Sequence, residues 1–171
     1  MRVRTDPAAV LDYGVPLLPD EVARIESRSV AAEQAMPTIE AYGVSHADEF
    51  GGAYLDHERG GVIATHWTGN LESHARGLWA ELREIAPGTP VRLQLVQHPL
   101  AELEHLQVQL TDDIDSWSEE GIAITAILLD VVNNELEVGV ADLEPGEAEQ
   151  LIQEYGGDRI RVTAMEEGTA P

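Results

Sequence analysis

The sequence predicts an α+β fold built from two ββαβ units. Short apolar runs with β-branched residues come in pairs, and each pair flanks a turn, Gly60-Gly61 in one case and Asn133-Asn134 in the other. A helical pattern and then a further apolar run follow each pair. Because the same order occurs twice, we infer an internal duplication of small three-stranded, mostly antiparallel sheets with helices on one face.

This pattern divides the chain into four segments. They are a helical or irregular N-terminal segment over residues 1–50, a first ββαβ unit over 51–98, a linking helix over 99–120, and a second ββαβ unit with a short C-terminal tail over 121–171. Pro37 is expected to end the N-terminal helix, because a proline has no N–H to continue the backbone hydrogen bonds.

In the first unit, the turn joins strands at 53–56 and 62–67, and a helix follows. The apolar residues of this helix recur every three or four positions and are Leu71, Ala75, Leu78, Leu82 and Ile85. Pro87-Gly88 ends the helix, and residues 91–96 form the third strand, which we expect to lie beside the first.

A single long helix is expected to link the two units and to end at Gly121. Its apolar stripe consists of Leu100, Leu103, Leu106, Leu110, Ile114 and Trp117. The second unit then has strands at 122–130, 135–141 and 160–165 and a helix at 145–155.

An overlay of the two units supports the duplication. Asp56 falls on Asp130 at the end of the first strand, and residues 91–93 fall on residues 160–162 in the third strand. The sequence therefore predicts that equivalent residues occupy equivalent places in the two sheets.

The chain is strongly acidic, with 32 Asp and Glu against 10 basic residues, all arginine, and a net charge of −22. Such a charge repels phosphates, so no nucleic-acid partner is expected. Without lysine and cysteine, Schiff-base chemistry, disulfides and thiolate metal sites are excluded. No run approaches the ~20 apolar residues of a membrane span, so we expect no membrane, and no cofactor or metal is expected. The compartment stays open: extracytoplasmic if a leader was removed, otherwise cytoplasmic.

Two histidines allow an alternative interpretation as a small hydrolase-type enzyme. His66 lies at a strand end and His74 at a helix start. With a nearby carboxylate, either could act as a general base in a pocket between the two units. The competing interpretation is that both are ordinary core histidines.

The acidic residues allow a further alternative, an acidic regulatory or structural protein. Asp112, Asp113 and Asp115 form the densest patch, which lacks the ligand order of an EF-hand. A solvated helix face is therefore favoured over a bound metal. Glu102 and His105 have the spacing of a helical metal pair, but no second pair lies on a facing helix.

From residue 51 onward, about two thirds of the chain resembles the pro-regions of secreted bacterial serine proteases of the alpha-lytic protease and streptogrisin type. The residues that carry the resemblance are 51–56, 61–64, the segment Val96-Gln97-His98-Pro99-Leu100-Ala101-Glu102-Leu103-Glu104, 121–130, Asn133-Asn134 and 136–138. Such pro-regions repeat a strand that ends in Asp, a short turn and a second strand. The resemblance thus implies the same duplicated fold.

The resemblance implies a non-enzymatic folding chaperone and inhibitor of a protease. Its last strand would dock on the protease and its tail, residues 166–171, would pass through the active-site cleft. The residues expected to contact the partner are Ile160, Arg161, Val162, Thr163, Ala164, Met165, Glu166 and Glu167. Because no Gly-Asp-Ser-Gly-type motif follows, we expect the chain to act in trans on a basic serine protease, or to descend from a pro-region that lost its protease. A free sheet edge would also permit a homodimer.

Overall fold

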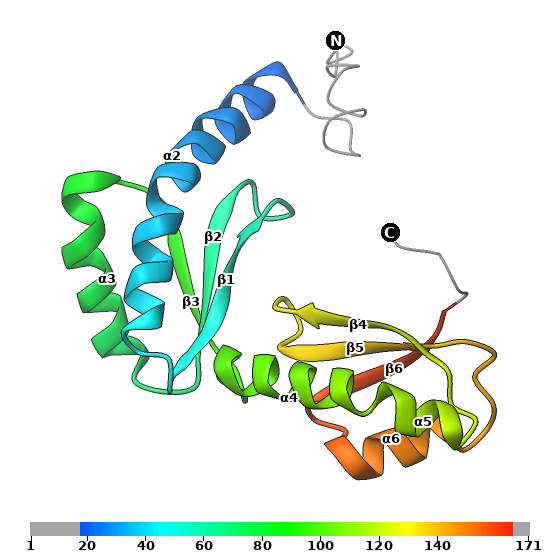
Figure 1. Cartoon of the computed structure of the whole chain (residues 1–171). Helices are drawn as coiled ribbons and strands as arrows, with labels where there is room; N and C mark the ends of the chain where they lie inside the picture. Colours follow the sequence, from blue (N-terminus) through cyan, green and yellow to red (C-terminus); the bar gives the residue numbers. More distant parts are fainter. Residues whose placement is uncertain (1–17, 166–171) are drawn as a thin grey trace. The chain divides into compact units, whose positions relative to one another are not determined.

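The computed structural model describes residues 18–165, without the side chains at positions 21, 24 and 25. This part of the chain forms two three-stranded sheets with their helices, so the predicted α+β class with two ββαβ units is confirmed (Figure 1). In chain order, the elements are α2 (Pro19–Val44), β1 (Phe50–Asp56), β2 (Val62–Trp67), α3 (Leu71–Ile85), β3 (Val91–Leu95), α4 (Leu100–Asp112), α5 (Ile114–Glu119), β4 (Ile124–Asp130), β5 (Glu135–Val140), α6 (Glu147–Tyr155) and β6 (Ile160–Ala164).

The chain divides into two compact units, each assembled from several segments. Over the described residues, the first comprises 18–45, Ala53–Thr65 and Asn70–Gln94, and the second comprises His46–Gly52, His66–Gly69 and 95–165. The first unit thus holds α2, α3 and most of the first sheet. The second holds the whole second sheet with α4, α5 and α6, together with the strand ends that adjoin its two short segments.

In both sheets the second strand lies in the middle, in the orders β1-β2-β3 and β4-β5-β6. The expectation that the third strand lies beside the first is therefore wrong. Consecutive strands tend to be neighbours, and the helix between the second and third strands brings the third back beside the second and parallel to it. The second sheet is consequently mixed, with β4 antiparallel and β6 parallel to β5.

The helix α2 continues through Pro37, where the sequence predicted its end. Pro37 is exposed, whereas Ala32, Ala35 and Ile39 on either side of it are buried. Burial of this face holds the helix in place before and after the proline. The loss of one backbone hydrogen bond is therefore tolerated.

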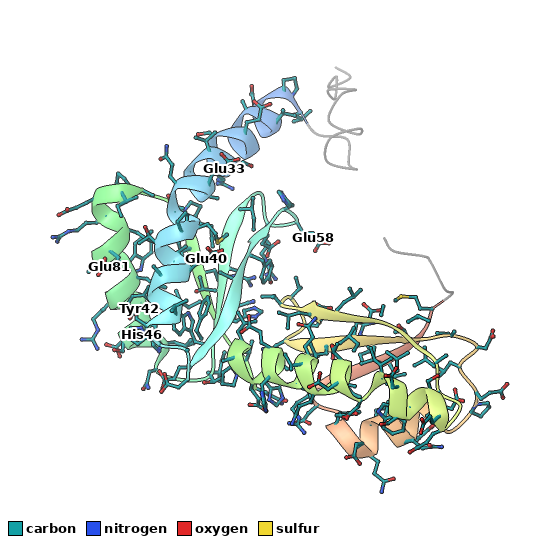
Figure 2. The ribbon with its side chains drawn as sticks, in the orientation of Figure 1. Glu33, Glu40, Tyr42, His46, Glu58 and Glu81 are labelled. Atoms are coloured by element: carbon teal, nitrogen blue, oxygen red, sulfur yellow. The ribbon has the colours of Figure 1, made fainter. Side chains whose placement is uncertain are left out.

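The helix α3 packs against α2 through a close contact between Gly77 and Tyr42. A Cβ atom added at Gly77 would lie only 2.7 Å from Cζ of Tyr42. The Tyr42 hydroxyl lies 3.4 Å from Nδ1 of His74. Burial raises the pKa of Tyr42, and the charge of Glu81 on α3 raises it further (Figure 2). The buried residues of α3 are His74, Leu78 and Leu82. Ile85, which the sequence placed on the same face, is 51% exposed.

The predicted linking helix consists of two helices, α4 and α5, which meet at Asp113. Its side chain accepts a hydrogen bond of 2.7 Å from the Tyr155 hydroxyl of α6. Aspartate is a weak helix former whose carboxylate favours such contacts at helix ends, and this accounts for the break. The predicted stripe on α4 is confirmed, because its buried residues are Leu103, Leu106 and Leu110.

Each sheet carries the same pair of charged residues, as the overlay of the sequence predicted. Nη2 of Arg92 lies 3.1 Å from Oδ2 of Asp56, and Nη2 of Arg161 lies 3.4 Å from Oδ2 of Asp130. Each aspartate also accepts, at 3.0 Å, the backbone N–H three residues further along its turn. These equivalent contacts support the internal duplication.

Candidate functional site

The strand β6 lies at an edge of the second sheet, where the resemblance placed the docking surface. Among the described strands it pairs with β5 alone, in a regular register from Leu136 opposite Ile160 to Val140 opposite Ala164. The other edge strand, β4, has a register shift near its start, and such an irregularity weakens pairing at an edge. Glu166 and Glu167, which were also predicted to contact a partner, lie outside the described residues.

Alternate backbone groups of β6 point away from β5. The N–H of Leu136 donates to the carbonyl of Arg159, and the N–H of Met165 donates to the carbonyl of Val140. Along a parallel strand pair, every second residue directs both its N–H and its C=O toward the partner strand. The two bonds given above therefore place the N–H and C=O groups of Val162 and Ala164 on the outer edge. Such outward N–H and C=O groups are the ones that an added strand uses.

Arg161 alternates along β6 with the core residue Ile160, and it is held by three carboxylates. Nε lies 2.7 Å from Glu135, the two terminal nitrogens lie 3.2 and 3.3 Å from Glu137, and Nη2 lies 3.4 Å from Asp130. The hydrogen bond to Glu135, followed by that to Glu137, raises the pKa of Arg161 against the effect of desolvation. The three carboxylates keep an excess of negative charge beside the exposed edge.

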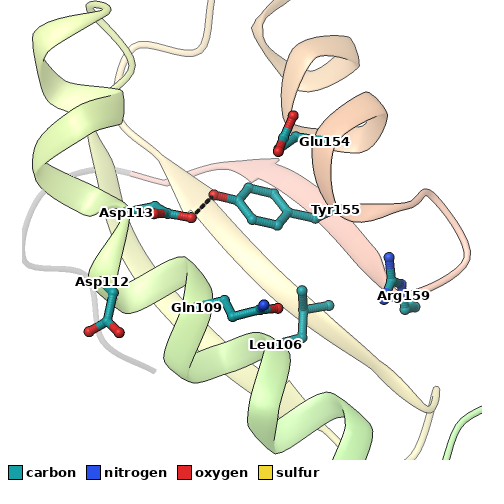
Figure 3. Close-up of a pocket in the computed structure, with 7 residues that line it drawn as sticks. All are labelled: Leu106, Gln109, Asp112, Asp113, Glu154, Tyr155 and Arg159. Atoms are coloured by element: carbon teal, nitrogen blue, oxygen red, sulfur yellow. Dashed lines mark hydrogen bonds between the residues drawn. The ribbon is translucent and has the colours of Figure 1, made fainter.

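A polar pocket of about 320 Å³ lies between α4, the junction with α5, and α6 (Figure 3). It is lined by Leu106, Gln109, Asp112, Asp113, Glu154, Tyr155 and Arg159. Figure 3 shows Asp112 and Asp113 at one end and Arg159 at the other. Leu106, which is only 3% exposed, belongs to the wall between them.

A chain of two hydrogen bonds fixes one wall of this pocket. The indole N–H of Trp117 on α5 donates to the Tyr155 hydroxyl at 2.8 Å, and that hydroxyl donates to Oδ2 of Asp113 at 2.7 Å. Burial, together with the hydrogen bond and the charge of Asp113, raises the pKa of Tyr155 to about 12. The hydroxyl therefore stays protonated and keeps α5 and α6 connected.

We expect this tyrosine to make the folded chain sensitive to alkali. Because its pKa is raised from 10.0 to about 12 on folding, its stabilising effect is complete below about pH 10 and is lost as the pH rises to about 12. In Tyr155→Phe, Trp117 and Asp113 lose their partner, so the free energy of unfolding at neutral pH should fall by roughly 1–2 kcal/mol. Urea unfolding should then show that the free energy of unfolding falls less between pH 10 and pH 12 for the variant than for the original chain. Equal losses in both proteins would contradict the prediction.

At Asp112 and Asp115 the acidic patch is exposed to solvent, as the sequence predicted, but it lies on two helices and not on a single helix face. Asp112 is exposed at the end of α4, whereas Asp113 binds Tyr155. Asp115 lies in the first turn of α5, where the helix dipole stabilises an acid.

The two histidines of the enzyme alternative are both buried, at 2% exposure for His66 and 3% for His74. His74 lies within the first unit, beside Tyr42 of α2. His66 belongs to the second unit, where its Cβ lies close to the backbone of Gly51. Neither lines the pocket described above, and both occupy positions typical of core histidines.

A charged cluster around His98 was not apparent from sequence spacing. His98 is 8% exposed, and its Nδ1 and Nε2 atoms each lie 3.5 Å from a carboxylate, that of Glu102 and that of Asp158. Arg159 lies 3.7 Å from Glu102. Glu102 thus pairs with His98 and Arg159, whereas His105, its predicted neighbour, is exposed. Only the four-residue spacing of His98 and Glu102 could have indicated the contact, because Asp158 and Arg159 are distant in sequence.

The peptide that carries His98 is held by Asn134 of the β4–β5 turn. Oδ1 of Asn134 accepts the N–H groups of Gln97 and His98 at 3.1 and 2.9 Å, and Nδ2 donates to the His98 carbonyl at 2.8 Å. Asn134 is buried and has a left-handed φ of 58°. The residue predicted from the sequence as a turn former is therefore also a buried connection to the start of α4.

Over residues 18–165, no group of three or more His, Asp or Glu side chains is arranged to hold a metal ion. In the same part of the chain, no helix combines the length and apolar character needed to cross a membrane. No protein-family model matches the sequence, and no curated protein is significantly similar to it.

Proposed function

We propose that this chain is a non-enzymatic protein-binding module that docks a basic partner protein along β6. The observation that carries the proposal is the regular edge of this strand, which pairs on one side only among the described strands and directs the N–H and C=O groups of Val162 and Ala164 outward. A strand of the partner would continue the sheet by backbone hydrogen bonding.

Backbone hydrogen bonds alone give little selectivity, because each contributes only about 0.5–1.5 kcal/mol and any extended segment offers them. Charge supplies the discrimination. The chain has a net charge of −22, and Arg161 beside the edge is outnumbered by Asp130, Glu135 and Glu137. A partner rich in Lys and Arg would associate faster, and the association would weaken with salt.

Basic chymotrypsin-fold serine proteases are the first partners to test, because the sequence resembles protease pro-regions. Binding, inhibition and assisted refolding should be measured with a panel of such proteases at micromolar concentrations. We expect a complex that weakens with salt. If none of the proteases is bound, inhibited or refolded, the protease version of the proposal is wrong.

Replacing Ala164 with proline should weaken partner binding at least tenfold, about 1.4 kcal/mol. The amide of Ala164 faces the outer edge, so proline there removes no hydrogen bond to β5 but blocks strand addition. Ala164→Ser, which keeps the amide, is the matched control and should bind as the original chain does.

Thermal unfolding should be nearly the same for both variants, and calorimetric titration gives the affinities. Equal affinities for Ala164→Pro and Ala164→Ser would exclude docking at this edge. Sedimentation of the chain by itself shows whether a second copy occupies the edge; a dimer that is lost in Ala164→Pro would replace the basic partner with self-association.

A further inference from the structure

We propose that the pocket between α4, α5 and α6 seats an arginine side chain of the partner protein. The inference rests on the proposed function, since it identifies the chemistry by which a basic partner is recognised. The volume of the pocket, about 320 Å³, lies at the small end of the range for ligand pockets, which is roughly 300–1,000 Å³. The pocket therefore suits a single side chain better than a folded segment.

Carboxylates at one end of the pocket are suited to a guanidinium group. Asp113 uses Oδ2 for the Tyr155 hydroxyl, which leaves lone pairs on Oδ1 for a ligand. Within residues 18–165, neither Asp112 nor Glu154 forms an ion pair. A guanidinium has five N–H donors in a plane and can bind several carboxylate oxygens together, which an ammonium group does less well.

The rest of the lining sets the direction in which an arginine would enter. Leu106, although only 3% exposed, forms part of the pocket wall, and the methylene groups of the side chain would lie against it. Arg159, at the opposite end in Figure 3, would repel a second cation but can donate to a backbone carbonyl of the partner. The guanidinium would thus lie toward Asp112 and Asp113, and the partner backbone toward Arg159.

The direct test is an NMR titration of the full chain with Nα-acetyl-arginine amide. A ligand of this size, held by one side chain, should bind with a dissociation constant of about 1 mM and should shift the resonances of Gln109 and Tyr155. Nα-acetyl-citrulline amide has nearly the same shape without the charge, and it should bind at least tenfold more weakly.

Asp112→Asn should reduce the affinity for the arginine probe at least fivefold. Asp112 is exposed at the C-terminal end of α4, where removal of a negative charge does not oppose the helix dipole, so the variant should fold. Glu104→Gln is the matched control, because it removes the same charge from an exposed position of α4 outside the pocket. It should leave the affinity unchanged.

Three results would overturn the inference: no saturable shifts at the pocket, equal binding of the citrulline probe, or equal losses in Asp112→Asn and Glu104→Gln. Tighter binding of free arginine than of the blocked probe would also overturn it, because it would indicate a site for a free amino acid. These outcomes are independent of the edge. If the arginine probe does not bind while partner binding remains sensitive to Ala164→Pro, the pocket inference is wrong and the proposed function stands. If the arginine probe binds and no partner protein is found, the proposed function is wrong instead.

Discussion

Replacing Asn134 with alanine should lower the free energy of unfolding by about 3 kcal/mol. The side chain makes three hydrogen bonds to the peptides of Gln97 and His98, and two of them are buried. Removing the amide leaves the buried N–H and C=O groups of His98 without partners. Alanine must also adopt the left-handed φ of 58°, which asparagine tolerates better.

Two further variants separate these effects. Asn134→Gly loses the amide but accepts the backbone conformation, so its loss should be about 1 kcal/mol smaller than that of alanine. Asn133→Ala changes the exposed neighbour, whose side chain bonds only to Asp130 at the surface, and should cost about 0.5 kcal/mol. If Asn134→Ala and Asn133→Ala have equal midpoints in urea unfolding, Asn134 does not hold the start of α4.

Replacing Gly77 with alanine should destabilise the first unit by about 2 kcal/mol. In an isolated helix the same change would stabilise by about 1 kcal/mol, so the expected sign is opposite to that of helix propensity. The reason is Tyr42, because the new Cβ would lie 2.7 Å from Cζ of the ring and would displace it from α3.

A double-mutant cycle with Tyr42→Leu tests whether this contact is the cause. Once the ring has been removed, Gly77→Ala should cost less than it does in the original chain, with a coupling energy above about 1 kcal/mol. Additive losses in the double variant would show that Gly77 is required for another reason.

Much of the fold could be predicted because it depends on local patterns. Gly60 (70°) and Gly61 (76°) of the first turn and Asn134 (58°) of the second have left-handed φ values, which tight turns of this kind require. The overlay of the two units predicted that Asp56 matches Asp130 and that residues 91–93 match residues 160–162, and in the structure each aspartate pairs with the arginine of its own sheet.

The remaining features depend on contacts between residues that are distant in sequence. Pro37 is tolerated because the residues around it are buried, and the helix break at Asp113 coincides with a hydrogen bond from Tyr155, 42 residues away. Strand order depends on how a crossover helix returns to the sheet, so the placement of the third strand could not be read from apolar spacing. For the same reason, the pocket beside Tyr155 had no sequence signature, and the cluster around His98 had only the four-residue spacing of His98 and Glu102.

The acidic character of the chain also becomes clearer in the structure. In the first unit, exposed acids such as Glu33, Glu40, Glu58 and Glu81 lie on outward positions (Figure 2). In the second unit, acids also gather beside the exposed edge of β6 and around the pocket. A partner with a basic segment and an exposed strand would match both features of the second unit.

Amide hydrogen exchange along β6 tests the proposed docking edge most directly. In the free chain, the amides of Val162 and Ala164 should exchange fast, whereas those of Arg161 and Thr163, which face β5, should be protected. On binding a basic partner, Val162 and Ala164 should become protected while Thr163 stays unchanged. A bound partner that leaves the exchange of Val162 and Ala164 unaltered, or protection of these two amides already in the free monomer, would contradict docking at β6.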